Sequence, residues 1–317
     1  MKRNKLIRKT DDKTMIDFKP ITLENKELYQ QYLLDGKERG CEYSFANLYL
    51  WGRQKATILH GHLTMFSQFN QRCVYPYPVG SGDKKAILDA LILDAKERGI
   101  PCRITSLDEE GKQTLEALYP GKFHFHCDLG NFDYVYDIND LADLPGRKYQ
   151  KKRNHCNHFR AEYPDYTVEP LSEVNLPLAK DMAENWYKEK LIENPQGDYL
   201  MEQTALAKAF RHFHALELEG LVLFAGNEVM AVTLGSRLSH DTFDVHFEKA
   251  KGDINGAYAI INQEFARYIR NKYPEIRFLD REEDMGIEGL RIAKQRYFPH
   301  HMQESYWAHL MEDDYEY

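Results

Sequence analysis

The feature that most constrains the fold of this chain is an order of elements that occurs twice. Each half predicts two helices, a three-stranded meander, a helix, a strand, and a further helix before a last extended segment. Equivalent elements lie about 165 to 177 residues apart, a spacing typical of duplicated domains and too long for a solenoid repeat. Because a single core seldom grows beyond about 250–300 residues, a chain of 317 residues suits two α+β domains.

The C-terminal half shows this order most clearly. The Gly226-Asn227 dipeptide is a hairpin turn signal between two β-branched runs, and Pro274 ends an amphipathic helix. The predicted elements are two helices within 178–213, strands at 221–225, 229–235 and 242–248, a helix from 256 to 273, a strand at 276–280 and a helix at 288–295.

The N-terminal half repeats the order. Its predicted elements are helices at 23–34 and 43–51, strands at 55–60, 62–69 and 73–77, a helix at 84–98, a strand at 102–105, a helix at 109–118, and strands at 123–126 and 133–137. We take the last of these strands as the end of the first half. The chain is therefore divided into a basic tail (1–14), an N-terminal domain (15–137), a basic bridging segment (138–160) and a C-terminal domain (161–317).

The bridging segment has the most unusual composition. Residues 147–160 contain no acid, and their cations are Arg147, Lys148, Lys151, Lys152, Arg153 and Arg160, with His155 and His158. On a helix, Arg147, Lys151, Asn154 and His158 share one face, and Tyr149, Cys156 and Phe159 form an apolar stripe near another. The net charge of −8 does not draw the whole chain to nucleic acid, so this local patch is the candidate for an anionic ligand. The alternative is a solvated basic face.

A second candidate site is the loop at 249–256, which precedes the central helix of the C-terminal half. Its residues include Lys249, Lys251, Gly252 and Gly256. Backbone N–H groups at a helix N-terminus bind phosphate or carboxylate, and glycine permits close approach. The alternative is a solvated connector with a glycine cap.

A third cluster follows the strand at 276–280. Carboxylates at a strand end, such as those of Glu282, Glu283 and Asp284, serve as bases or bind an ammonium group, and Arg281 can hold a carboxylate or phosphate in two hydrogen bonds. The alternative is an acid-rich first helical turn, which accounts for Glu283 and Glu288 but not for Arg281.

The remaining signals exclude several classes of protein. The five cysteines include no Cys-x-x-Cys pair, which argues against a disulfide framework and a zinc ribbon and favours reduced thiols in the cytoplasm. No apolar run approaches the ~20 residues of a membrane span, and the basic N-terminus lacks the apolar stretch of a signal peptide. The segment His155–His158 lacks four convergent ligands, so no metal site is predicted. Neither a nucleophile triad nor a Walker-type phosphate loop is found.

Several short segments together resemble one known family. They are Asp133–Asp137, Leu144–Tyr149, Lys151–Asn154, Phe247–Lys249, Gly256–Tyr258, Arg281–Gly286, Glu288–Leu290 and Lys294. From about Phe18 to Pro299 the chain resembles the C-terminal domain of the phosphatidylglycerol lysyltransferases (DUF2156-type). The resemblance implies a tandem duplicated GNAT (acyl-CoA N-acyltransferase-like) fold, with two mixed, mostly antiparallel sheets flanked by helices, related to the Fem-type peptidoglycan aminoacyltransferases.

The resemblance also implies roles for individual residues. Those implied at the reacting ester and its cleft are Glu248, Arg281, Glu282 and Asp284. Those implied to bind the donor or other substrate are Lys148, Lys151, Lys152, Arg153, Asn154, Lys249, Gly256, Tyr258, Lys294 and Tyr297. Aminoacyl transfer needs alignment of ester and nucleophile and stabilisation of an oxyanion, so a catalytic triad is not expected.

Three functions follow as hypotheses. The leading one is transfer of an aminoacyl group from aminoacyl-tRNA to a small-molecule, peptide or lipid acceptor that the sequence does not identify, with no resident cofactor. The membrane-spanning part of the lipid-modifying relatives is missing, which counts against a lipid acceptor. The second is a CoA-dependent N-acyltransferase, but Gly252 and Gly256 do not match the Arg/Gln-x-x-Gly-x-Gly/Ala loop of acetyl-CoA enzymes. The third is a non-catalytic binding protein that kept the fold.

Overall fold

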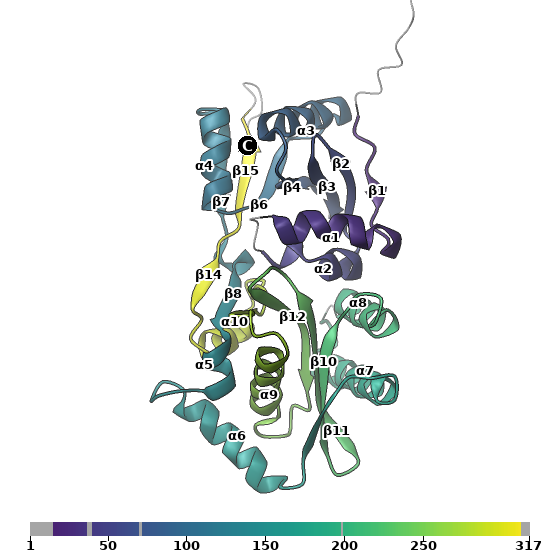
Figure 1. Cartoon of the computed structure of the whole chain (residues 1–317), viewed down its shortest axis with the longest axis vertical. Helices are drawn as coiled ribbons and strands as arrows, with labels where there is room; N and C mark the ends of the chain where they lie inside the picture. Colours follow the sequence, from purple (N-terminus) through teal and green to yellow (C-terminus); the bar gives the residue numbers. More distant parts are fainter. Residues whose placement is uncertain (1–14, 37–39, 70–71, 198, 312–317) are drawn as a thin grey trace, which may run out of the picture.

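A computed structural model of the protein describes residues 15–36, 40–69, 72–197 and 199–311. Within these residues the strands form two sheets, and Figure 1 shows the two sheets at opposite ends of an elongated molecule, each with its own helices. The predicted basic tail at 1–14 lies outside the described residues.

The first sheet has the strand order β1-β2-β3-β4-β6-β15-β7, with β5 paired to β3. Its strands are β1 (Lys19–Pro20), β2 (Gln54–Leu59), β3 (His62–Phe69), β4 (Arg72–Pro76), β5 (Val79–Gly80), β6 (Arg103–Leu107), β7 (Phe123–Cys127) and β15 (Tyr306–Leu310). The helices around it are α1 (Lys26–Asp35), α2 (Phe45–Trp51), α3 (Lys84–Arg98) and α4 (Glu109–Leu118), with short 3-10 turns at Leu23–Asn25, Cys41–Tyr43 and Leu129–Asn131.

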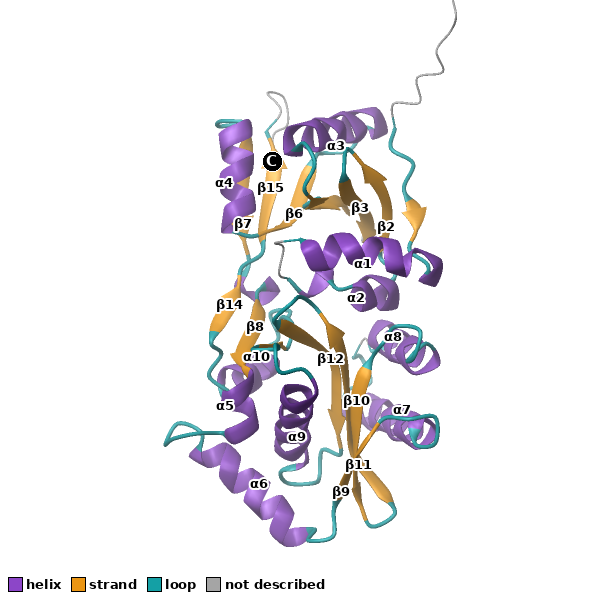
Figure 2. Cartoon of the chain, viewed as in Figure 1, coloured by secondary structure: helices purple, strands orange, loops and turns teal. Residues whose placement is uncertain are grey.

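The second sheet has the order β14-β8-β13-β12-β11-β10-β9. Its strands are β8 (Asp133–Asp137), β9 (Thr167–Pro170), β10 (Glu219–Ala225), β11 (Glu228–Arg237), β12 (Thr242–Ala250), β13 (Phe278–Asp280) and β14 (His301–Gln303). Its helices are α5 (Ile138–Asp143), α6 (Gln150–Glu162), α7 (Leu176–Glu193), α8 (Leu200–Arg211), α9 (Ala257–Lys272) and α10 (Glu288–Gln295). Helices α7 and α8 cover one face of this sheet and α9 covers the other (Figure 2).

The two halves exchange strands, which the sequence did not predict. Strand β8 pairs with β13 and β14 in the second sheet, and β15, from the far end of the chain, pairs with β6 and β7 in the first. The assignment of 133–137 to the first half is therefore wrong, and the extended tail after Pro299 includes two strands. All four residues 133–136 are buried, and burial on both faces fits a strand between two neighbours in either sheet, so the pattern could not name the sheet.

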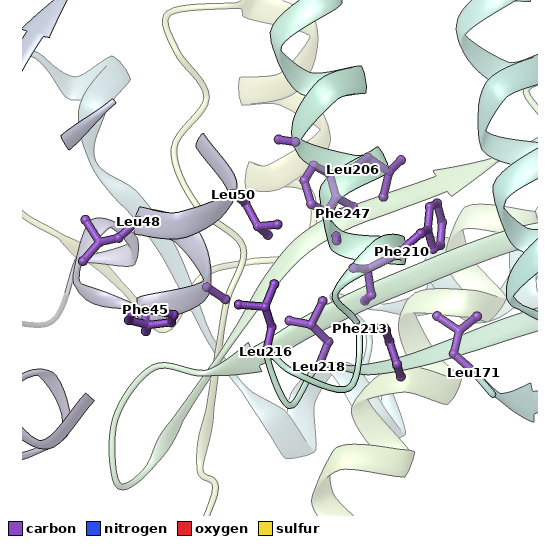
Figure 3. Packing of buried hydrophobic residues seen from close by; sticks show 14 of the residues in the cluster. Phe45, Leu48, Leu50, Leu171, Leu206, Phe210, Phe213, Leu216, Leu218 and Phe247 are labelled. Carbon is purple, nitrogen blue, oxygen red and sulfur yellow. The ribbon is translucent and has the colours of Figure 1, made fainter. Parts of the chain in front are cut away.

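The hydrophobic core is continuous between the halves. One cluster of buried residues joins Phe45, Leu48 and Leu50 of α2 to Leu206 of α8 and Phe247 of β12, and Figure 3 shows Leu50 nearest to the latter two. All five side chains are buried, and burying a side chain of this size stabilises the fold by about 1.5–3 kcal/mol. Together with the exchanged strands, this contact joins the two halves into one structural unit.

Strands β12 and β13 diverge, and this divergence positions the candidate site. They pair in parallel only from Thr242 with Phe278 to Asp244 with Asp280. Beyond this point β12 continues to Ala250, whereas β13 has ended. From His246 to Ala250, the backbone edge of β12 on this side is therefore not paired with β13.

The first sheet diverges in the same way between β4 and β6 but closes the gap differently. There the pairing is limited to Tyr75 with Ile104 and Pro76 with Thr105. The hydroxyl of Tyr43 lies 3.1 Å from the carbonyl oxygens of both Tyr77 and Ser106 and so joins the diverging segments. A tyrosine hydroxyl therefore joins the diverging segments after β4 and β6, whereas charged side chains lie where β12 and β13 diverge.

Candidate active site

An ion pair crosses the gap between β12 and the end of β13. Arg281 Nη2 donates to Glu248 Oε1 at 3.0 Å, and Asn262 of α9 donates to the other carboxylate oxygen at 3.3 Å. The side chains of Arg281 and Glu248 are only 15% and 8% exposed. The second guanidinium nitrogen of Arg281, Nη1, has no hydrogen-bond acceptor among the described residues. It is a buried donor without a partner, beside a carboxylate held in one orientation.

A second cation lies against the same aromatic ring. Lys152 Nζ is 3.5 Å from the ring centroid of Tyr297, and the Arg281 guanidinium is 5.0 Å from it. Burial lowers the pKa of Lys152 to about 8, with a further lowering by Arg281 and a partial offset by Glu248. The lysine can therefore hold or release a proton close to neutral pH, while the ring stabilises the charged form.

The shifted lysine gives a direct prediction. In trace acylation with acetic anhydride followed by peptide mass spectrometry, labelling of Lys152 should reach half its maximum near pH 8, against about 10.4 for an ordinary lysine. Glu248→Gln should move the midpoint lower, because the carboxylate that favours the ammonium form is removed. A wild-type midpoint near pH 10 would contradict the burial of this amine.

Glu282, predicted as catalytic, contacts a different set of residues. Its backbone has φ 58°, a left-handed conformation that turns the chain after Arg281. Glu282 Oε1 lies 3.3 Å from both His246 Nδ1 and Asn47 Nδ2. Burial and Asp244 raise the pKa of Glu282 to about 7, and burial alone would lower the pKa of His246, but Asp244 and Glu282 raise it to about 10.

Asp284 and Lys294, both predicted as site residues, are held by several hydrogen bonds. Asp284 is fully buried and accepts hydrogen bonds from Arg291, the Tyr134 hydroxyl and the Gly286 amide. Lys294 Nζ donates to the carbonyl oxygens of residues 281, 282 and 283. Asp284 is thus held by β8, by α10 and by its own loop, and Lys294 by the loop that carries Arg281. The position of Asp284 at the reacting ester stays a prediction.

The basic bridging segment folds as α5 and α6, and its cations separate. The apolar stripe of α6 is buried as predicted, at Tyr149, Cys156 and Phe159. Among the predicted donor-binding residues of this segment that the structure describes, Lys152 alone lies against Tyr297 and close to Arg281. The others lie apart: Lys148 pairs with Asp140, Arg153 donates to the carbonyls of Leu144 and Gly146, and Lys151 and Asn154 are exposed.

The loop predicted to bind phosphate is divided between two sides of the sheet. Successive side chains of a strand point to opposite faces, so Lys249 points away from Glu248. Its Nζ lies 2.6 Å from Glu202 of α8 and 4.1 Å from the ring centroid of Trp186. The Tyr258 hydroxyl accepts a hydrogen bond from the Trp186 indole at 3.2 Å, and Trp186 lines a hollow of about 410 Å³.

Gly256 packs against α6 rather than standing open to a ligand. Its φ is +90°, and a Cβ there would lie 2.3 Å from the carbonyl oxygen of His155. A glycine is therefore required for the contact between α6 and the start of α9.

Sequence reasoning missed several residues of these sites. They are Tyr136 beside Arg281, Asn262 on Glu248, and Asp244 and His246 near Glu282. The Asp244-x-His246 alternation was a usable signal, because two polar residues at i and i+2 share one face of a strand. The sequence contains no comparable signal for Asn262, because its partner Glu248 comes from another element.

Comparison with known proteins identifies a family and similar structures. A family model described as "Phosphatidylglycerol lysyltransferase, C-terminal" matches residues 35–309. A conserved protein of unknown function from Bacteroides thetaiotaomicron VPI-5482 is 37% identical, covers 94% of this chain and 100% of its own, and superposes with a TM-score of 0.89. The uncharacterized protein MYCGA3080 of Mycoplasmoides gallisepticum is 23% identical over 171 residues, 53% of this chain, and the match spans 52% of that relative, about half its length.

Two more distant structures share the whole architecture. L-PGS from Bacillus licheniformis is 14% identical with a TM-score of 0.67, covering 93% of this chain and 94% of that one. FemX is 11% identical with a TM-score of 0.59, covering 93% and 98%. The predicted fold class, tandem GNAT-like with two mixed sheets flanked by helices, is confirmed. No helix of the described residues has the length and apolar character needed to cross a membrane. With the family model matching most of its length, this chain belongs to the family of phosphatidylglycerol lysyltransferase C-terminal domains.

Proposed function

We propose that this chain is an aminoacyltransferase that takes its aminoacyl group from aminoacyl-tRNA and that the ester reacts at Glu248 and Arg281. Family membership and fold support an acyl or aminoacyl transferase of the lysyltransferase and Fem class. One observation carries the placement of the reaction: a buried cation with an unpartnered donor, Arg281 Nη1, lies beside an oriented carboxylate at the divergence of the two strands.

The arrangement suits attack on an ester carbonyl. An acceptor amine or hydroxyl forms a bond to the carbonyl carbon, the ester C–O bond breaks, and the proton of the nucleophile passes to the departing tRNA hydroxyl. Arg281 Nη1 would donate to the developing oxyanion, and Glu248 would accept and return the proton. Lys152 adds positive charge on the same side through its position over Tyr297.

The exposed face of α6, together with the turn before it, is the candidate contact for tRNA phosphates. Arg147, Lys151, Asn154 and His158 are all exposed. Within the described part of the chain, Arg147 and Lys151 form no ion pair. Both charges therefore remain available to phosphate groups, in contrast to Lys148 and Arg153.

A charge-reversal pair tests this contact. The variant Arg147→Glu with Lys151→Glu should weaken tRNA binding at low salt at least about tenfold, and the slope of log affinity against log salt should fall by about 2. The melting temperature should stay nearly unchanged, because both side chains are exposed. Electrophoretic or fluorescence titration at several salt concentrations measures both quantities.

The matched control reverses two exposed lysines of the first half, Lys55 and Lys122, and should leave tRNA affinity within about twofold. Equal losses in both variants would reduce the effect to net charge, and no tRNA affinity of the wild type at low salt would end the proposal. Acetyl-CoA, the donor of the competing function, should leave the melting temperature unchanged; a concentration-dependent rise would favour that function instead.

A further inference from the structure

A group of buried ligating side chains outside the Glu248–Arg281 pair lies where the two halves meet. Asp244 and His246 come from β12 and Glu282 from the turn after β13, with side-chain exposures of 0%, 1% and 17%. One ligand atom from each lies within 4.8 Å of the others. These residues have no part in the aminoacyl transfer argued above.

Two of the three separations between the ligand atoms match a tetrahedral metal site. His246 Nδ1 lies 3.2 Å from Asp244 Oδ2 and 3.3 Å from Glu282 Oε1. With metal–ligand distances of about 2.0–2.1 Å, two ligands of a tetrahedral zinc ion lie ~3.3–3.4 Å apart. A histidine and two carboxylates leave the fourth position for water or another small ligand, as in reactive rather than closed zinc sites.

The contacts of His246 suit an imidazole that binds a metal through Nδ1. The ring's other nitrogen, Nε2, lies 2.8 Å from Ser236 Oγ. A histidine that binds a metal commonly donates its second N–H to an oxygen, which fixes the tautomer and turns the lone pair of the first nitrogen toward the ion. Asn47 Nδ2, from α2, holds the Glu282 carboxylate at 3.3 Å in the same manner.

Further evidence comes from buried carboxylate oxygens. Asp244 is fully buried, its Oδ2 lies against His246 Nδ1 at 3.2 Å, and its Oδ1 has no hydrogen-bond donor among the described residues. Asp280, its register partner on β13, is also fully buried and leaves Oδ2 without a donor. A buried carboxylate without donors is strongly unfavourable in its charged form, and a bound cation removes that cost.

We propose that Asp244, His246 and Glu282 bind one divalent transition-metal ion of the zinc type. The ion would join β12 to the turn that carries Arg281, and through Asn47 it would join the second half to the first. The competing arrangement is a proton on His246 Nδ1 held between the two carboxylates, with no metal. This proposal is independent of the proposed transfer reaction.

Metal content and titration distinguish the two arrangements. Tag-free full-length protein is treated with a chelator, dialysed and titrated with Zn²⁺ alone, with Mn²⁺ and Mg²⁺ in parallel. We expect one equivalent of Zn²⁺ by elemental mass spectrometry, micromolar or tighter affinity by calorimetry, and a Tm rise of about 5 °C at saturation. Wild-type protein that binds no Zn²⁺ at 100 μM would overturn the proposal.

Two variants locate the ion. Glu282→Gln keeps the size of the side chain and should weaken Zn²⁺ binding at least tenfold, and His246→Gln should abolish it. A neighbouring group with ligand geometry, Cys41, Glu42 and Asp133, supplies the matched control, since Cys41→Ser should leave the affinity unchanged. If His246→Gln fails to fold, the comparison of Glu282→Gln with Cys41→Ser is sufficient. Weaker Zn²⁺ binding by Cys41→Ser, or unchanged Zn²⁺ binding by Glu282→Gln, contradicts the assignment.

Discussion

Replacing Arg281 by methionine is expected to lower the free energy of unfolding by about 3 kcal/mol or more, because Glu248 is then buried without its cation. Glu248 is 8% exposed, and its remaining hydrogen bond comes from the neutral amide of Asn262. Lys152, whose ammonium form Glu248 favours, partly compensates and keeps the loss near the lower end of the usual 3–5 kcal/mol. Denaturant unfolding with an unchanged m-value measures the effect.

Two further variants test whether that loss of stability comes from the Arg281–Glu248 ion pair. The double variant Arg281→Met with Glu248→Gln should recover most of the stability, because no uncompensated charge remains buried. Arg277→Met, an exposed arginine four positions earlier, should change stability by less than about 0.5 kcal/mol. If Arg281→Met were no worse than Arg277→Met, the ion pair across the diverging strands would not be the buried contact described.

Elements with local signals were predictable from the sequence. Helices α3 and α4 have the predicted bounds, and each begins at an aspartate, Asp83 or Asp108, whose side chain accepts a hydrogen bond from the first helical turn. The exchange of β8 and β15 was not predictable, because the partner of a strand depends on residues far away in the chain. Strand propensity alone does not distinguish two sheets of the same protein.

In the candidate site, too, features with a local sequence signal were predictable and those that depend on the fold were not. On α6, Lys152 lies four residues before Cys156 and seven before Phe159, the spacing of one helix face. Helical periodicity was therefore sufficient to distinguish the half-buried Lys152 from the exposed Lys151, although the basic run was predicted as one group. By contrast, strand alternation puts Glu248 and Lys249 on opposite faces, but their partners, Asn262 of α9 and Glu202 of α8, follow only from the fold.

Asp284 carries the charge expected of a catalytic carboxylate, but it is held by hydrogen bonds within the fold. Its replacement gives the second large expected effect on stability. Asp284→Ala should lower the free energy of unfolding by about 3 kcal/mol at pH 7, because the Tyr134 hydroxyl, the Gly286 amide and Arg291 all lose a buried ionic acceptor. Arg291 holds the pKa of Asp284 at about 2. The folded pKa is thus depressed, so this stabilisation is complete above the ordinary carboxyl pKa of about 4 and is lost as pH falls toward 2.

Measured by denaturant unfolding between pH 7 and pH 2, the gap between wild type and Asp284→Ala should therefore stay constant down to about pH 4.5 and then narrow. Glu288→Ala, an exposed acid on the same segment, should show a small difference at every pH, since a solvated first-turn carboxylate contributes only about 0.3–1 kcal/mol through the helix dipole. Transfer activity distinguishes a structural role of Asp284 from a role at the ester when it is measured where both proteins are fully folded. Loss of a structural anchor lowers the fraction of folded protein, whereas loss of a group at the ester lowers the rate of the folded protein. A folded Asp284→Ala protein with undiminished stability and a rate reduced a hundredfold would return this residue to the reacting ester.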